Sequence, residues 1–211
     1  MDLCAIVSRA YHKTSRRRAC RERGNCVLFM MLPPNLSDEF QIGELIAEIS
    51  TAFDGVARED GTTLHEAIAI DNRKSSEECL AARRLDTEQR WQDVPEMDII
   101  KGSSVASFLD AKGFRYYLPA FLVCGLKNWN SSTIAIVESF EYCLLHESQK
   151  SLRKTEPASI AEKYGFTEAQ CKAIAHFLRF SIGEDDESTS QPATTLQAVR
   201  KWECFVGDHV S

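Results

Sequence analysis

The stretch Ser107-Phe-Leu-Asp-Ala-Lys-Gly-Phe-Arg-Tyr-Tyr-Leu-Pro-Ala-Phe121, called the aromatic block below, combines two helix signals with a dense group of aromatic rings. Gly113 predicts the end of a helix that starts at Ser103 or Ser104, because glycine commonly follows the last helical turn. Pro119 predicts the first turn of the next helix, where its missing N–H is not needed. The block contains five aromatic rings, those of Phe108, Phe114, Tyr116, Tyr117 and Phe121.

The five rings of the aromatic block allow three interpretations. They can join two helices in the core, with Asp110 paired to Arg115 at the surface. They can form a recognition surface, since tyrosine and arginine are enriched where proteins bind one another. They can line a small aromatic pocket for a ligand. The sequence alone leaves all three open.

Capping signals elsewhere in the chain indicate helices. Capping boxes are formed by Thr63 with Glu66, Ser75 with Glu78, and Thr167 with Gln170. The chain lacks an Asn-Gly or Asp-Gly hairpin between alternating strands. We therefore expect an all-α or mostly α protein, a single compact domain of about seven to eight short helices. A minor β element is allowed where Ile134 and Ile136 alternate with other residues.

Helical spacing of apolar residues predicts which faces are buried. Ser37 is the expected cap of a helix that ends near Gly55, and Pro157 is expected to open a helix that Gly165 ends. The predicted inward face of the first helix is Phe40, Leu45, Ile46, Ile49 and Phe53. The predicted inward face of the last helix is Ala198, Val199, Trp202, Phe205 and Val206.

The sequence divides into four parts. Residues 1–36 form a basic extension, either disordered or lying upstream of a translation start at Met30 or Met31. Residues 37–182 form the main helical domain, and 183–195 form an acidic and polar linker. Residues 196–206 form a C-terminal helix that packs on the main domain.

Charge is distributed unevenly between these parts. Residues 1–36 hold seven Lys or Arg against two acidic residues, a net of +5, and the rest of the chain has a net of −11, which gives −6 for all 211 residues. An acidic body repels phosphates and anionic lipid heads. We therefore expect no membrane and no nucleic acid as partner, except through the basic N-terminal stretch.

The cysteines indicate a reducing compartment. No two of the eight are separated by two residues, so the usual zinc and redox spacings are absent. Cys143 and Cys171 fall on predicted apolar faces, as reduced core cysteines of a cytoplasmic protein do. A zinc site of Cys4, His12, Cys20 and Cys26 has suitable ligand types but matches no common module.

Catalytic motifs are mostly missing from the sequence. It has no glycine-rich phosphate loop and no Gly-x-Ser-x-Gly turn, and His65-Glu66 lacks the second histidine of a zinc protease, because position 69 is Ala. Polar side chains are dense between residues 58 and 93. They are either a hydrolytic or metal site or a lattice of caps and ion pairs. The candidate catalytic residues are His65, Asp60, Glu66 and Asp71. We predict no cofactor and no metal.

The aromatic block carries a resemblance. Together with Asp60-Gly-Thr-Thr-Leu-His-Glu-Ala67 and Phe166-Thr-Glu-Ala-Gln170, it resembles an uncharacterised bacterial family, a domain of unknown function. The resemblance covers about residues 40–205 and leaves the basic stretch outside. It implies no reaction, cofactor or catalytic residue.

Two functions follow as expectations. The first is a non-catalytic protein-interaction module of the bacterial cytoplasm: an adaptor, an inhibitor or an immunity-type protein. Its expected contact set is Trp91, Arg115, Tyr116, Tyr117 and Asp86, with Asp60 and Glu66. The alternative is a metal-assisted hydrolase that uses His65 as ligand or base and Asp60 and Asp71 as carboxylate ligands.

Overall fold

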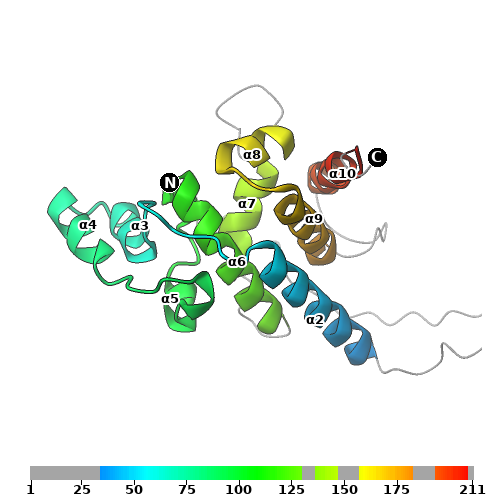
Figure 1. Cartoon of the computed structure of the whole chain (residues 1–211), viewed down its shortest axis with the longest axis horizontal. Coiled ribbons are helices and arrows are strands. Elements are labelled where there is room, and N and C mark those ends of the chain that lie inside the picture. The colour runs from blue at the N-terminus through cyan, green and yellow to red at the C-terminus, as the bar shows by residue number, and fades with distance from the viewer. Residues whose placement is uncertain (1–33, 130–135, 147–156, 183–192, 209–211) are drawn as a thin grey trace, which may run out of the picture.

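The computed structural model describes residues 34–129, 136–146, 157–182 and 193–208. These residues form nine α-helices, and none of them lies in a β-strand. The mostly α fold is thus confirmed (Figure 1). The α-helices are α2 Pro34–Ala52, α3 Leu64–Asp71, α4 Ser76–Arg83, α5 Glu96–Lys101, α6 Ala111–Lys127, α7 Glu138–His146, α8 Pro157–Tyr164, α9 Glu168–Ile182 and α10 Ala193–Asp208.

Several expectations fall outside the described residues. They concern the basic extension up to residue 33, the proposed zinc ligands within it, most of the linker, and Ile134 of the allowed β element. Two boundaries differ from the predicted ones: α2 begins at Pro34 rather than after Ser37, and α10 begins at Ala193 rather than at residue 196.

Helix α6 lies at the centre of the fold and is built from the aromatic block. Of its 17 residues, 13 are buried. The predicted helix end at Gly113 is wrong, because Asp110 caps α6 and Gly113 lies in its first turn, where its N–H donates to the Asp110 carboxylate at 2.8 Å. A Cβ on Gly113 would lie 2.3 Å from the Thr62 carbonyl oxygen, so glycine permits this close approach.

Pro119 lies inside α6, so the prediction that it lies in the first turn of a helix is wrong. Its missing N–H deprives the Arg115 carbonyl of its helical donor, which ordinarily destabilises a helix by about 3 kcal/mol. Leu118 and Phe121 on either side are fully buried. The packing of the whole helix offsets the local loss.

Aromatic stacking joins α6 to the helices around it. Phe114 stacks on Tyr164 of α8 with ring centroids 4.0 Å apart, and Phe121 packs on Phe140 of α7 at 4.4 Å. Phe53 at the end of α2 meets Phe166 edge-on at 6.2 Å. These contacts place α7 and α8 against α6, and α2 packs on both α6 and α9.

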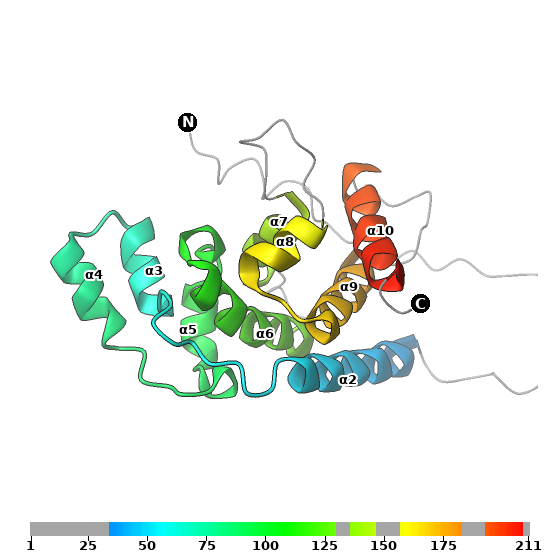
Figure 2. The same cartoon turned by 45° about the horizontal axis from the view of Figure 1, so that its top comes forward.

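The outer helices bury one face each. In α2, Leu45 and Ile49 are buried, whereas Phe40 is 67% exposed, so the predicted inward position of Phe40 is wrong. In α10, Val199 and Trp202 are buried, and the Trp202 indole N–H donates to the Leu144 carbonyl at 3.2 Å. This contact joins α10 to α7, while α10 lies mainly against α9 (Figure 2).

Three capping boxes are confirmed at helix starts. Thr63 and Glu66 satisfy each other's backbone N–H groups before α3, and Ser75 and Glu78 do so before α4. Reciprocal bonds also join Thr167 and Gln170 before α9. Gly55 and Gly165 follow α2 and α8 with positive φ, the conformation that ends a helix.

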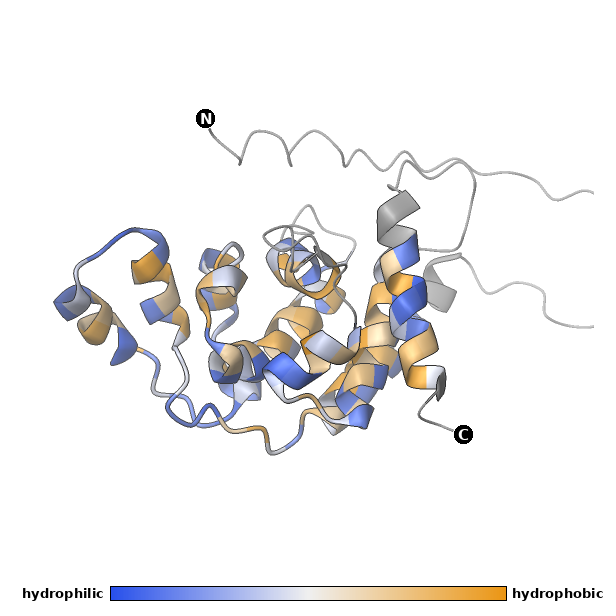
Figure 3. Ribbon diagram, turned by 90° about the horizontal axis from the view of Figure 1, so that it is seen from above, coloured by the Kyte–Doolittle hydropathy of each residue, from blue (hydrophilic) through white to orange (hydrophobic). Residues whose placement is uncertain are grey.

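The pair α3 and α4, called the arm below, projects from one end of the molecule (Figures 1 and 2). Helix α4 packs mainly on α3, and none of its residues is buried. Figure 3 shows both hydrophilic and hydrophobic residues on this helix, whereas α6 at the centre is mostly hydrophobic. The described part of the chain has no helix that is long and apolar enough to cross a membrane.

Candidate functional site

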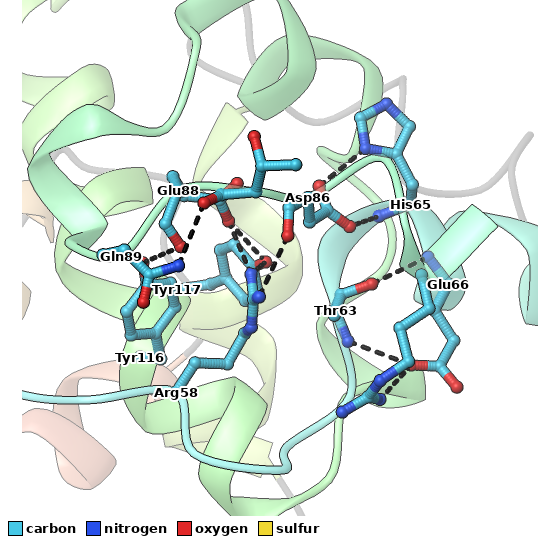
Figure 4. A network of polar contacts seen from close by, with 11 residues as sticks. Arg58, Thr63, His65, Glu66, Asp86, Glu88, Gln89, Tyr116 and Tyr117 are labelled. Atoms are coloured by element: carbon cyan, nitrogen blue, oxygen red, sulfur yellow. Dashed lines mark hydrogen bonds and ion pairs between the residues drawn. The ribbon is translucent and has the colours of Figure 1, made fainter. Parts of the chain in front are cut away.

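Part of the polar region between residues 58 and 93 gathers around the side chain of Arg58 (Figure 4). Its guanidinium donates to the Glu88 carboxylate at 2.8 Å, to the Tyr117 hydroxyl at 3.0 Å and to the Asp86 carbonyl at 3.0 Å. The group also lies 5.6 Å from the centre of the Tyr116 ring. Arg58 thereby holds the loop after the arm against α6.

The two tyrosines of this cluster are buried hydrogen-bond donors. Tyr117 donates to the Glu88 carboxylate at 2.9 Å, and Tyr116 donates to the Glu88 carbonyl at 3.4 Å. Burial raises the pKa of Tyr116 to about 12 and that of Tyr117 further above its ordinary value. Both phenols are therefore neutral at physiological pH and are poorly suited to proton transfer.

His65 is oriented by Asp86, not by Asp60 as the sequence suggested. One Asp86 oxygen accepts the His65 backbone N–H at 2.8 Å, and the other lies 2.7 Å from the ring Nδ1. The ring Nε2 faces Asp98 at 3.7 Å. Because the buried Asp86 carboxylate contacts both the backbone and the ring of His65, it fixes the imidazole plane. The ring stays partly exposed to solvent.

The other candidate catalytic residues have different partners. Asp60 is exposed and contacts the Lys112 ammonium at 2.6 Å, a hydrogen bond that lowers the pKa of the Asp60 carboxyl. Glu66 completes its capping box and pairs with Arg83. Asp71 is exposed at the end of α3.

These contacts do not assemble His65, Asp60, Glu66 and Asp71 into one site. Within the described ranges, His, Cys, Asp and Glu side chains form no group of three or more that could hold a metal ion. The geometry agrees with the interpretation of this region as a lattice of caps and ion pairs.

The expected contact residues are mostly interior. Tyr116 and Tyr117 are fully buried, and Trp91 is 3% exposed and donates its indole N–H to the Phe53 carbonyl at 2.9 Å. Arg115 does not pair with Asp110; it donates to the Gly165 carbonyl at 3.2 Å and to Glu59 at 3.4 Å. Of the three interpretations of the aromatic block, the burial agrees with the core.

Sequence reasoning missed the surface of the arm. Leu80 is 57% exposed on α4, and Leu85, just after the helix, is 64% exposed. Ile70 on α3 is also exposed. The signal was present in the sequence, since Leu80 lies three residues after Glu77 and four before Arg84, which places it on a charged helix face.

Two surface grooves lie away from these residues. One runs between α2 and the end of α6 and is lined by Ile42, Ile46, Leu126 and Trp129, among others. The second lies between α8 and α10 beside Arg200 and Cys204. Neither groove includes a candidate catalytic or contact residue.

Fold and site together define a small α-helical domain that is braced by an internal polar cluster and carries one projecting arm. The chain belongs to a Family of unknown function (DUF6714), whose model matches residues 41–203. The match covers every helix from within α2 into α10 and excludes the basic stretch. No curated protein and no solved structure matches the chain.

Proposed function

We propose that this protein is a non-catalytic protein-interaction module that docks through the outer face of α4. The observation that carries the proposal is that α4 buries none of its eight residues and presents Leu80 to solvent. A single exposed leucine is ordinary on a protein surface. A whole helix that adds nothing to the core is less ordinary, because a helix this short is unstable by itself.

Helix α4 is instead stabilised by local contacts at its start and its end. The Ser75–Glu78 capping box holds its first turn, and Lys74 pairs with Glu78 at 3.1 Å. Near the other end, Arg83 pairs with Glu66 and donates to the Asp60 carbonyl at 2.7 Å. The helix is thus presented in a fixed orientation, and a preformed surface loses little conformational entropy on binding.

The environment proposed for this module is the bacterial cytoplasm. Three cysteines, Cys124, Cys143 and Cys171, are buried free thiols, and burial raises the pKa of Cys143 and Cys171 to about 11. Such thiols are unreactive and are typical of reducing compartments. Bacterial origin is supported by the resemblance of the aromatic block.

The test compares binding by wild type, Leu80→Glu and Met97→Glu. Met97 is 62% exposed on α5, so its substitution is a matched control away from the arm. A partner captured from the host is purified, and the complex is reconstituted from the two proteins alone. We expect Leu80→Glu to weaken binding at least about tenfold and Met97→Glu to leave it unchanged. Equal binding by both variants would refute the docking face.

A hydrolytic role is the second candidate, and the orientation of His65 favours it. A buried carboxylate on Nδ1 leaves Nε2 as the ring atom for proton transfer, with Asp98 beside it. This candidate uses Asp86 and Asp98 in place of Asp60 and Asp71. It predicts that wild type hydrolyses chromogenic ester or phosphate substrates and that His65→Gln does not. No turnover by wild type across such a panel would count against it.

A further inference from the structure

The outer face of α4 carries a stripe of four residues. Glu77, Leu80, Ala81 and Arg84 are all exposed. Their spacing of three, four and seven residues places them along one side of a helix. The less exposed residues Cys79, Ala82 and Arg83 occupy the opposite side, towards α3. The stripe therefore points away from the rest of the molecule.

The charges at the two ends of the stripe lack partners within the described part of the chain. Of the four charged residues of α4 and its C-cap, Glu78 pairs with Lys74 and Arg83 pairs with Glu66. No ion pair or side-chain hydrogen bond joins Glu77 or Arg84 to another described residue. The charges that face inward are thus satisfied, and the charges that face outward are left for a partner.

The order of the stripe is self-complementary. The midpoint between Glu77 and Arg84 lies between Leu80 and Ala81. A two-fold axis through that midpoint, perpendicular to the helix, places Glu77 of one copy opposite Arg84 of the other. The same axis places Leu80 opposite Ala81, so that a large side chain meets a small one and the helices can approach closely.

We propose that α4 pairs antiparallel with α4 of a second copy of this chain about this two-fold axis. The proposal rests on the proposed function and names the partner of that docking face. Two Glu77–Arg84 pairs fix the register, and the two leucines supply the apolar contact. Glu77 near the N-terminus and Arg84 at the C-cap also each match the dipole of their own helix.

The dimer is expected to be weak. An eight-residue helix is only about 12 Å long. Two helices of that length bury less surface than the roughly 1,200 Å² that stable complexes bury. Association is therefore concentration-dependent and belongs to the weak, transient class.

The test is sedimentation velocity of the full chain from about 10 μM to about 1 mM, with charge reversals. Glu77→Arg or Arg84→Glu alone places like charges opposite each other twice, so each is expected to weaken the dimer at least about tenfold. The double variant E77R/R84E restores opposite charges, as does an equimolar mixture of the two single variants. Both are expected to return to within about threefold of wild type. Glu44→Arg, exposed on α2, is the control.

The possible results distinguish a failure of the α4 dimer from a failure of the docking function. A wild type that stays monomeric to about 1 mM, or a double variant that fails to regain association, overturns the dimer. If another protein still binds in a Leu80-dependent manner, the docking function stands and only the identity of the partner is wrong. If neither association is found, both proposals fail. The substitution sites of the two tests, Glu44, Glu77, Leu80, Arg84 and Met97, are all exposed, and circular dichroism confirms that the variants fold.

Discussion

Helices α6 and α4 show two different ways in which this chain makes a helix. Helix α6 buries 13 of its 17 residues and tolerates a proline in its interior. Helix α4 buries none of its eight residues and depends on a complete capping box. The difference shows that packing stabilises the first and local hydrogen bonding the second. Substitutions in the two helices should therefore have unlike effects on stability.

The largest effect is expected from Phe114→Ala in α6. Phe114 is fully buried and contacts Tyr164 and Phe140, so removal of its ring leaves a cavity. We expect the free energy of unfolding, measured by urea titration, to fall by about 3–5 kcal/mol. The matched change Leu80→Ala in α4 should alter it by less than about 0.5 kcal/mol. A similar loss in both variants would erase the distinction between the helices.

A second effect is a pH dependence of stability that comes from Glu141 in α7. Burial raises the pKa of the Glu141 carboxyl to about 7 from its ordinary 4.5, and Glu138 adds to the shift while a hydrogen bond from Ser181 opposes it. The folded protein thus keeps a proton that the unfolded chain releases. The contribution of Glu141 to stability is therefore highest below about pH 4.5, falls as pH rises to about 7 and then levels off.

Glu141→Gln removes this dependence. We expect it to raise the free energy of unfolding by about 2–3 kcal/mol at pH 8 and to leave it nearly unchanged at pH 4. The measurement is thermal melting across that pH range, with Glu44→Gln on the exposed side of α2 as control. Parallel curves for wild type and Glu141→Gln would contradict the assignment.

The smallest effect is expected from loss of the N-terminal cap of α4. Ser75→Ala removes the cap of α4, which is expected to lower the local opening free energy by about 1 kcal/mol. Hydrogen exchange should then be about fivefold faster for α4 amides and unchanged for α6 amides. The pKa of Glu78, held at about 2 chiefly by its hydrogen bonds with Ser75, should rise. Uniform acceleration across both helices would mean that α4 opens only with the whole domain.

The sequence predicted the contacts between residues that are close together in the chain and missed those between distant residues. The capping boxes span three residues, so the positions of Thr63 and Ser75 were sufficient to locate two helix starts. Gly113 and Pro119 were misjudged because their roles depend on Thr62 and on the surrounding core, which no local pattern contains.

In the candidate site, the contacts that the sequence could not predict also join residues far apart in the chain. His65 and its orienting partner Asp86 are 21 residues apart, and Arg58 and Tyr117 are 59 apart. Local spacing offered Asp60 to His65, but Lys112 binds Asp60 instead. Trp91 and the tyrosines could be assigned equally well to a surface or to the core, since aromatic composition is common to both.

The absence of buried side chains from α4 has an evolutionary consequence. Selection for folding acts on the core and leaves the outward positions of this helix free to vary. The outward residues of α4 can therefore change while the chain keeps the same scaffold. Under the proposed docking function, the choice of partner can change while the fold is kept, and paired changes at positions 77 and 84 would be the sign of an antiparallel contact.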